Sequence, residues 1–555
     1  MITMQEPKTS FGKTRAEDKI QIFKTLVGER ANWDTNWQTL HDYFYIESPN
    51  LNRSYAPGAE LDVTYLWDST TLDAADVFAS GFMNYLTPAS SKWSRLRSKS
   101  PNLTENKDVA DYFEDVNDEL HYALNRSNYY DQCFPSYKSS GVYGTSVIME
   151  EEDIDDDIRF YSLPLTQVCI VEDGRGRVAE YYIEFEYTAT QANDKWGDAI
   201  SDEMKEELKA FKEKKHKFLL FIGKRGYRDV NKQDRKNMPF EALWIDVDKK
   251  TIVDEGGYNE WPAFCHRFDK RPFIPWGFSP AMKALPFARM LNAAAKTTMR
   301  SMMKHTDPPL ALPENAFIMP FNANPRAINY YKKTAMDSGK DIFPFANTGD
   351  PQVGMSSVEY YANAVKRLMF NDVFLAFNGI DKQMNNPEIM ERINEKMTLL
   401  GPAVGRWIVE VINPIVVRTI GILDRRGRLP EMPEELMENP NYEIECVGQL
   451  AQAQRRSSLN NLVTGLTMIG QMATFSPEAL DKISPDKTVD EIWEITGSPV
   501  TVLRSDDEVA RIRENRAKQQ AAINNMQMVG AGTEVVKSAS EVDKNIAQAK
   551  EIPKE

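Results

Sequence analysis

The segment from Phe287 to His305 constrains the fold of this chain more than any other. At about 100° per residue, four of its basic side chains fall within roughly 80° of one another on a helix. These four are Arg289, Lys296, Arg300 and Lys304. Most residues between them are small or unbranched, such as the run Ala293–Ala295. The segment therefore predicts a closely packed helix with one cationic stripe, which favours a polyanion or an acidic partner.

The helix cannot extend far beyond His305, because Asp307-Pro308-Pro309 follows. Proline lacks a backbone N–H, and its ring clashes with the preceding turn of a helix. Residues 308–355 are rich in Pro, Asn and Gly and predict a small inserted module. A capping-box spacing, Ser356-x-x-Glu359, predicts that helix resumes there and runs to about Phe377. Two helices are thus expected to bracket a compact insertion.

The bulk composition limits the class of protein. With 555 residues and 42% hydrophobic content, the chain should form two or more domains. No run approaches the roughly 20 apolar residues of a membrane span, and the first residues lack a signal-peptide pattern. The four cysteines are isolated in sequence, which predicts buried thiols in a reducing compartment and no structural zinc.

The net charge is −15, which argues against a protein that coats nucleic acid with its whole surface. Residues 101–160 hold 15 Asp and Glu against 4 Lys and Arg. The densest run, Glu150 to Asp157, is interpreted as a solvated hairpin or loop. It has no glycine for a calcium loop. A magnesium-dependent nuclease site at Asp155 and Asp157 is disfavoured, because no histidine partner or PD…ExK pattern is present.

The first half of the chain predicts three core-packing helices followed by strands. The helices are expected at 15–45, 70–86 and 107–126, the first with Trp33, Trp37 and Tyr43 along one face. From residue 158 to about 269, runs rich in β-branched and aromatic residues predict antiparallel strands, with a turn at Asp173–Gly176. The expected strands are 159–163, 167–172, 178–188, 218–222, 243–247 and 251–254, with a Lys-rich helix at 203–215.

The second half is predicted to be mainly helical. Asn386-Pro387-Glu388 is a strong helix start after a loop at 378–386, and the helical pattern continues to Arg426-Gly427. Pro402 and Pro414 lie inside it and predict kinks or a break. A short strand is expected at 442–447, and helices dominate from 449 to about 528. The remaining residues are polar without a periodic core face.

No pattern in the chain favours catalysis. There is no GxxxxGK[ST] phosphate-binding motif, and the glycines near Asp173 lack the third glycine of a dinucleotide loop. The five histidines are isolated in sequence, and Gly144–Ser146 lacks a nucleophile-elbow pattern. The sequence therefore predicts a protein that is not an enzyme and that needs no cofactor or metal.

An ordered series of short motifs resembles the head-to-tail connector, or portal, proteins of short-tailed bacteriophages. The similarity covers roughly residues 15–520 and extends through Gly401-Pro402 to Arg428-Leu429-Pro430. The other motifs, in order, are Arg30-x-x-Trp33-x-x-x-Trp37, Trp67-Asp68-Ser69-Thr70, Leu86-Thr87-Pro88 with Trp93, Ser127-Asn128-Tyr129, Tyr143-Gly144-Thr145, Pro275-Trp276-Gly277-Phe278-Ser279-Pro280 and Asp307-Pro308-Pro309.

This resemblance implies an α+β, mainly helical subunit of a ring, with wing, stem, clip and crown regions. The implied regions are 1–280, wing of helices and antiparallel strands; 281–305, first stem helix; 306–355, clip; 356–377, second stem helix; 378–386, channel (tunnel) loop; 387–427, long wing helix; 428–448, return strand of the wing; 449–528, helical crown; and 529–555, mobile C-terminal tail.

The resemblance also implies a function and a set of partners. The ring, usually of twelve subunits, lies at one capsid vertex of the virion, and double-stranded DNA is packaged and ejected through its channel without sequence specificity. The expected partners are other copies of the chain, terminase, capsid and scaffolding proteins, and a tail adaptor, after assembly in the host bacterial cytoplasm. No membrane is involved. The residues expected to contact channel DNA or a neighbouring subunit are Arg289, Lys296, Arg300, Lys304 and Lys382.

Two alternatives remain open from the sequence. The first is a virion structural protein that forms no ring, such as a minor capsid or internal ejection protein. The second is a packaging nuclease or ATPase, which the missing motifs disfavour. For the basic stripe itself, a solvated helix face is the competing interpretation, and for Lys382 it is an exposed loop lysine.

Overall fold

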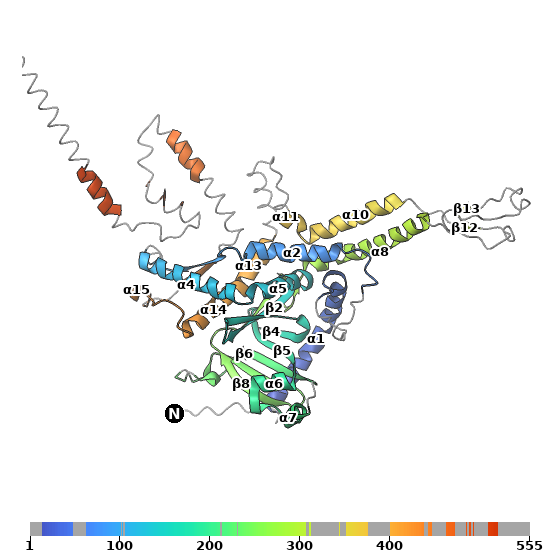
Figure 1. The fold of residues 1–555 in the computed structure, drawn as a ribbon, viewed down its shortest axis with the longest axis horizontal. Helices are drawn as coiled ribbons and strands as arrows, with labels where there is room; N and C mark the ends of the chain where they lie inside the picture. Colours follow the sequence, from blue (N-terminus) through green and yellow to red (C-terminus); the bar gives the residue numbers. More distant parts are fainter. Residues whose placement is uncertain are drawn as a thin grey trace, which may run out of the picture. The chain divides into compact units, whose positions relative to one another are not determined.

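The computed structural model describes most of the first 437 residues and short pieces of the rest (Figure 1). The described residues are 14–47, 63–100, 103, 106–210, 214–229, 231–232, 234–306, 310–311, 343–344, 351–375, 400–437, 442–446, 462–471, 484, 488–489, 492 and 509–519. Two compact units divide the chain. The first comprises 1–96, 115–430 and 444–464, and the second comprises 97–114, 431–443 and 465–555.

The predicted N-terminal helices are present. Helix α1 (Arg15–Phe44) begins at a capping box in which Thr14 and Glu17 satisfy each other's backbone N–H groups. Helix α2 (Thr70–Leu86) has the predicted bounds, and so does α4 (Lys107–Arg126), whose first residues belong to the second unit. Helix α5 (Tyr129–Tyr143) was not predicted, because Pro135 and Gly141 lie inside it and it is buried on most sides.

Two antiparallel sheets follow, as the strand patterns predicted. One has the order β3-β2-β9 and the other β4-β5-β6-β7-β8. Their strands are β2 (Thr145–Asp153), β3 (Asp157–Leu163), β4 (Val168–Glu172), β5 (Val178–Thr188), β6 (Lys215–Lys224), β7 (Phe240–Asp246), β8 (Thr251–Tyr258) and β9 (Ala263–Arg267). Strands β2 and β9 were not predicted from the sequence.

The Lys-rich helix is shorter than predicted. It forms α7 (Asp202–Lys209), and Lys215 already belongs to β6. A separate helix, α6 (Ala189–Trp196), starts at a second capping box, made by Thr188 and Gln191. The acidic run was predicted to be a solvated hairpin or loop, and it forms the hairpin β2–β3. The prediction that the run is solvated is wrong at Glu150, which is fully buried.

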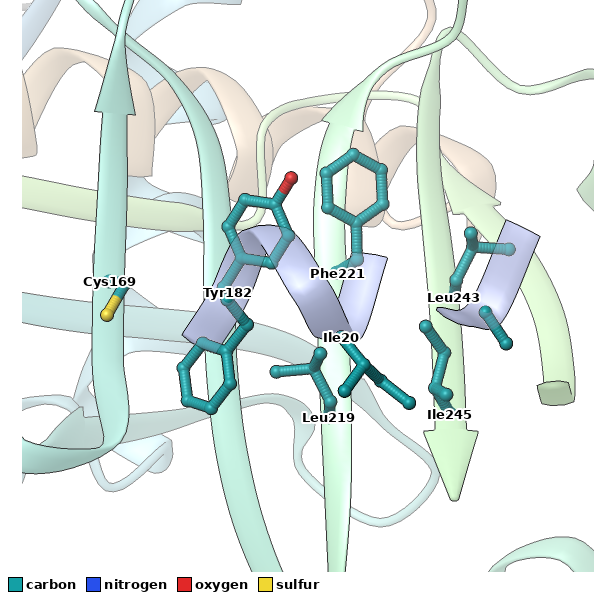
Figure 2. Packing of buried hydrophobic residues seen from close by; sticks show 9 residues of the cluster. Ile20, Cys169, Tyr182, Leu219, Phe221, Leu243 and Ile245 are labelled. Atoms are coloured by element: carbon teal, nitrogen blue, oxygen red, sulfur yellow. The ribbon is translucent and has the colours of Figure 1, made fainter. Parts of the chain in front are cut away.

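Helix α1 covers one face of the five-stranded sheet (Figure 2). Ile20 and Phe23 pack against alternate residues of neighbouring strands, because side chains at i and i+2 share a face of a sheet. These sheet residues are Cys169, Tyr182, Leu219, Phe221, Leu243 and Ile245. Trp244 and Phe218 belong to an aromatic cluster with Tyr187 and Trp196. The sheet is thus packed on both faces.

The long basic helix is α8 (Pro280–Thr306), in agreement with the helix predicted over 281–305. Helix α10 (Pro351–Leu368) returns beside it (Figure 1). The predicted start of α10 at Ser356 is wrong, since the Ser356 hydroxyl donates within the helix to the Gln352 carbonyl. The predicted continuation to Phe377 is also wrong. Phe370 adopts φ 59°, which ends the helix before α11 (Asn371–Leu375).

The ends of the predicted insertion meet in one short ladder. Strand β12 (Leu310–Ala311) pairs antiparallel with β13 (Phe343–Pro344). The remainder of the predicted clip, 306–355, lies outside the described residues apart from these strands and the adjoining ends of α8 and α10. The channel loop 378–386 and the predicted tail 529–555 lie outside them entirely.

The long helix departs from regular α-helical geometry directly before Pro414, one of the two prolines at which a kink or break was predicted. It runs as α13 (Gly401–Trp407), a π-helical turn η4 (Ile408–Ile412) and α14 (Asn413–Arg425). The Asn413 N–H donates to the Ile408 carbonyl, five residues back. Because Pro414 has no N–H and its ring crowds the carbonyl four residues earlier, a widened turn accommodates it. Its predicted start near Glu388 lies outside the described residues.

The remaining described elements are short. Strand β14 (Tyr442–Cys446) lies where a strand was predicted, and β1 (Ser94–Ser98) was not predicted. The second unit contains α15 (Glu434–Met437), and residues 462–471 and 509–519 are helical, inside the region predicted to be helical. Across the described residues the chain is a mixed α+β protein in which helix predominates.

Candidate nucleic-acid interface on helix α8

Helix α8 begins where its sequence provides a cap. The Ser279 hydroxyl accepts a hydrogen bond from the Met282 N–H at 2.9 Å. Pro280 occupies the first helical position, where a missing N–H costs nothing. From Pro280 to Thr306 the helix has five basic residues and no Asp or Glu. Its charge is therefore not balanced along its own length.

The first half of α8 is fixed to the body of the first unit. Ala281, Ala284, Ala288 and Leu291 are buried, on the side that meets α1 and α5. Asn292 adds a polar anchor, since its amide donates to the Tyr65 carbonyl at 2.9 Å and its oxygen accepts from the Trp67 N–H at 2.7 Å. This half is thus held in one orientation.

The second half of α8 packs on α10 through very small side chains. Thr298 is 9% exposed, and it faces Gly354 of α10. A Cβ atom at Gly354 would lie only 2.6 Å from the Thr298 hydroxyl oxygen. Thr298 is nine residues after Arg289, which is about half a turn around the helix. The side of α8 that contacts α10 is therefore opposite the basic stripe.

The structure brings the predicted stripe residues to the outer side of α8. Arg289, Arg300 and Lys304 are exposed, and none of them forms an ion pair with another described residue. Lys296 is half-buried, with its ammonium 5.6 Å from the centre of the Trp67 ring. Three stripe residues thus form an open cationic face, while Lys296 also packs on an aromatic ring. Lys382 lies outside the described residues.

Several sequence motifs prove to be parts of the framework that holds α8. Gly144 (φ 82°) touches Gly277 so closely that no side chain fits at either position, and the Gly277 N–H donates to the Thr145 hydroxyl at 2.9 Å. Trp37 donates from its indole to the Tyr143 carbonyl at 3.1 Å and packs edge-on against Trp276. Motifs more than 100 residues apart thus meet directly before α8 begins.

Arg30 holds another part of this framework. Its guanidinium donates to three backbone carbonyls just before and at the start of β4: Leu165 at 2.9 Å, Thr166 at 2.9 Å and Val168 at 2.6 Å. The motif that contains Arg30, Trp33 and Trp37 is therefore structural. Its residues orient the sheet and the loop before α8.

A buried ion-pair network, which sequence reasoning missed, joins β9 to the π-helical turn. Arg267 is 3% exposed and donates to Glu410 from Nε at 3.1 Å and from Nη2 at 2.5 Å, and it also pairs with Glu172. Lys270 lies 2.9 Å from Glu172. These residues are far apart in sequence, so no local pattern could have revealed the network.

A second missed group is Glu150 on β2. Its carboxylate accepts from the Thr419 hydroxyl at 2.8 Å, and its backbone carbonyl accepts from Arg418 Nε at 3.1 Å. Burial raises the pKa of the Glu150 carboxyl to about 8, although Arg418 opposes the shift. Both partners lie on α14, so Glu150 fixes the long helix to the acidic hairpin.

Among the described residues, His266 and Ser140 form a buried pair of an imidazole and a hydroxyl. His266 Nδ1 and Ser140 Oγ form a hydrogen bond of 2.7 Å, and both side chains are buried. Burial lowers the pKa of His266 to about 3, so this imidazole is neutral. Within the described residues, no three His, Cys, Asp or Glu side chains converge on a point where a metal ion could bind. None of the described helices is both long and apolar enough to cross a membrane.

The described elements define a mixed α+β protein in which α8 and α10 pack closely at Thr298 and Gly354, and in which α8 has a basic outer face. The family model of bacteriophage head to tail connecting proteins matches residues 16–503. The portal protein of Salmonella phage epsilon15 is 27% identical over 541 residues, which cover 95% of this chain and 96% of that protein. The probable portal protein of Bordetella phage BPP-1 is 27% identical over 526 residues, which cover 93% and 94%.

The chain belongs to the family of bacteriophage head-to-tail connecting proteins. Its function is that of a portal protein, the component that connects the phage head to the tail. The resemblance noted from the ordered motifs is therefore confirmed.

Proposed function

We propose that this chain assembles into a closed ring, of twelve subunits, at one vertex of the capsid. Genomic DNA enters through the axial channel during packaging and leaves through it during ejection. In this assignment residues 1–280 and 387–448 form the wing, and 281–305 and 356–377 form the stem, which contains α8 and most of α10. Residues 306–355 form the clip, 378–386 the channel loop, 449–528 the crown and 529–555 the tail. The role is structural rather than catalytic.

The observation that carries the proposal is the outer face of α8. Arg289, Arg300 and Lys304 are exposed there, with no described carboxylate paired to them, on the side of the helix opposite Thr298. A closed ring repeats this face in every subunit, which turns a stripe into a band of positive charge. Such a band attracts the phosphate backbone without reading sequence, so DNA can slide.

The second candidate for the same face is an acidic surface of the neighbouring subunit. The observation that favours it is the distribution of charge, because the chain carries net charge −15 while α8 carries only bases. In that arrangement the stripe stabilises the ring instead of contacting DNA. The two candidates differ in what a charge reversal affects, ring assembly or DNA handling.

We propose further partners on the basis of the portal function. Terminase engages the ring during packaging, capsid and scaffolding proteins surround it during assembly, and a tail adaptor binds afterwards. The ring is a component of the virion, assembled in the bacterial cytoplasm. These partners follow from the role of a connector and not from any described contact.

Negative-stain microscopy of the purified chain tests the ring directly. Rings with a central hole are expected, whereas monomers or filaments would contradict the proposal. The stripe is tested with Arg300→Glu combined with Lys304→Glu. Intact rings with poor DNA packaging or retention support a DNA contact, and loss of rings supports the inter-subunit contact.

A matched control keeps the change in charge but moves it elsewhere. Lys24 on α1 and Lys209 on α7 are exposed and form no ion pair with another described residue. Lys24→Glu with Lys209→Glu should leave both rings and DNA-filled particles normal. Normal DNA-filled particles from the α8 double variant as well would rule out a role of Arg300 and Lys304 in DNA handling.

A further inference from the structure

The connection between β6 and β7 is strongly basic, although the chain as a whole is acidic. Residues 224–236 hold six bases and two acids, in a protein of net charge −15. The bases are Lys224, Arg225, Arg228, Lys232, Arg235 and Lys236. This segment lies at one end of the five-stranded sheet and is not part of α8 or α10.

The connection is held in place by its own contacts. Arg225 is 7% exposed and donates to the Met238 carbonyl at 3.1 Å and to the Gly256 carbonyl at 2.7 Å. Gly257 on β8 lies so close to the Arg235 carbonyl that an added Cβ would be 2.8 Å from it. Arg225 therefore acts inside the structure and presents no charge to a partner.

The outward bases lie on two adjoining segments of this connection. The Asp229 N–H donates to the Asn237 side-chain oxygen at 3.0 Å, which joins the two segments that carry Arg228 and Lys236. Both are exposed, and so is Lys224 at the end of β6. None of the three forms an ion pair with another described residue. Their charge is therefore available to a ligand.

The remaining two bases are partly balanced. Lys232 lies 3.9 Å from Asp229, and Arg235 lies 3.4 Å from Asp254. Beside them Tyr227 is 73% exposed, with its hydroxyl available as a hydrogen-bond donor. Three unbalanced cations and one exposed phenol are groups of the kind that contact phosphate oxygens in protein–nucleic-acid interfaces.

We propose that the 224–236 connection is a second binding site for the phosphate backbone of duplex DNA, separate from the α8 stripe. Among the described residues of this connection, Tyr227 is the exposed aromatic side chain and no apolar cluster is present, which distinguishes the surface from a protein interface with a desolvated hydrophobic centre. Binding is electrostatic, independent of sequence and sensitive to salt. The site extends the proposed function, because it allows the sheet region of each subunit to hold DNA outside the channel.

The test uses the full-length protein, with fluorescence anisotropy of a labelled, closed circular duplex at several salt concentrations. A closed circle cannot thread a ring, so surfaces outside the channel account for its binding. The variant is Arg228→Gln with Lys236→Gln. Since each phosphate contact contributes about 0.9 to the slope of log affinity against log salt, the magnitude of this slope should fall by about 1.8.

The control removes two charges at the other end of β6. Lys209→Gln with Lys214→Gln lies roughly 30 Å away, given ten residues of β6 at about 3.3 Å each. This variant should leave the slope unchanged. An unchanged slope in Arg228→Gln with Lys236→Gln, or an equal decrease in both variants, would overturn the proposed site. The α8 variant tested on linear DNA reports on the channel separately.

Tyr227→Phe gives a second, independent measurement. It removes the hydroxyl without changing charge or fold, so the salt slope should remain while the affinity decreases about two- to fivefold, the effect of one hydrogen bond. If circular DNA binds the charge variant as tightly as the wild-type chain, the connection serves an acidic protein surface instead, and the proposal is wrong.

Discussion

Thr298 on α8 and Gly354 on α10 are in direct contact, at a point where only hydrogen fits on the α10 side. The Thr298 hydroxyl oxygen and its methyl carbon would lie 2.6 and 3.0 Å from a Cβ atom at residue 354. Threonine is stiff at χ1, so it cannot swing away without strain. The distance between the two helices is therefore set by this pair, and so is the position of the basic stripe on the far side of α8.

Gly354→Ala should push the two helices apart. The added methyl group overpacks the contact and should destabilise the helix pair by about 1–3 kcal/mol. Thr298→Ala should restore most of this loss in the double variant, because it removes both conflicting atoms. Hydrogen exchange of peptides from 290–306 and 351–368 measures the effect locally. Additive effects of the two substitutions would show that these residues do not set the helix spacing.

Glu150→Gln should change the pH dependence of stability. Because the folded-state pKa of Glu150 is raised from 4.5 to about 8, folding takes up a proton between these values, and stability falls as pH rises through this window. Glutamine keeps the acceptor for Thr419 and cannot ionise. The variant should therefore gain stability at pH 8, on the order of 3 kcal/mol, and lose the decline between about pH 4.5 and pH 8.

Thermal unfolding between pH 5 and pH 9 measures this difference. Glu152→Gln provides the control, since Glu152 is an exposed neighbour that pairs with Arg425 at 2.8 Å. Its pH profile should follow that of the wild-type chain. A Glu150→Gln profile that declines with pH as steeply as the wild type would contradict the assignment of Glu150 as the titrating group.

Local sequence patterns were sufficient for elements whose causes are local. The bounds of α2 and α4 followed from apolar spacing and terminal residues, and the π-helical turn in the long helix lies directly before Pro414, where a kink or break was predicted. Helix α5 was not predicted because Pro135 and Gly141 have low helix propensity. The burial of most α5 side chains against other elements compensates for this low propensity. Ser356 was mistaken for the start of α10, although Asp350-Pro351 carries the same kind of start signal as Asn386-Pro387, and the helix begins at Pro351.

The candidate sites divide in the same way. The stripe on α8 was predictable, since charge and helical period are both visible in the sequence. Glu150 looked like a surface acid among seven, because its partner Thr419 lies 269 residues away. Arg267 and Glu410 are likewise 143 residues apart. Contacts between residues so far apart produce no periodic pattern in the sequence. The burial of Glu150 and Arg267 and the identity of their partners are therefore visible only in the structure.

Arg267→Met should be strongly destabilising. Its guanidinium is the shared partner of Glu172 and Glu410, and its removal leaves Glu410 without this partner and Glu172 with Lys270, in a largely enclosed site. Breaking a buried ion pair in this way costs about 3–5 kcal/mol. Combining Arg267→Met with Glu410→Leu and Glu172→Gln should recover part of the loss, as measured by denaturant unfolding. Equal stability of the single and the combined variant would show that uncompensated charge is not the cause.

Phe273 is fully exposed and adopts φ 63°, in the turn between β10 (Asp269–Lys270) and β11 (Gly277–Phe278). A left-handed conformation is costly for a side chain of this type, and its ring gains no buried contact in return. Phe273→Gly should therefore raise the stability of the folded subunit by about 1 kcal/mol. Phe273→Ala keeps the unfavourable φ and should give much less, so the difference in unfolding midpoint between the two variants isolates backbone strain. If alanine stabilises as much as glycine, exposure of the ring and not the backbone conformation is the source of the cost.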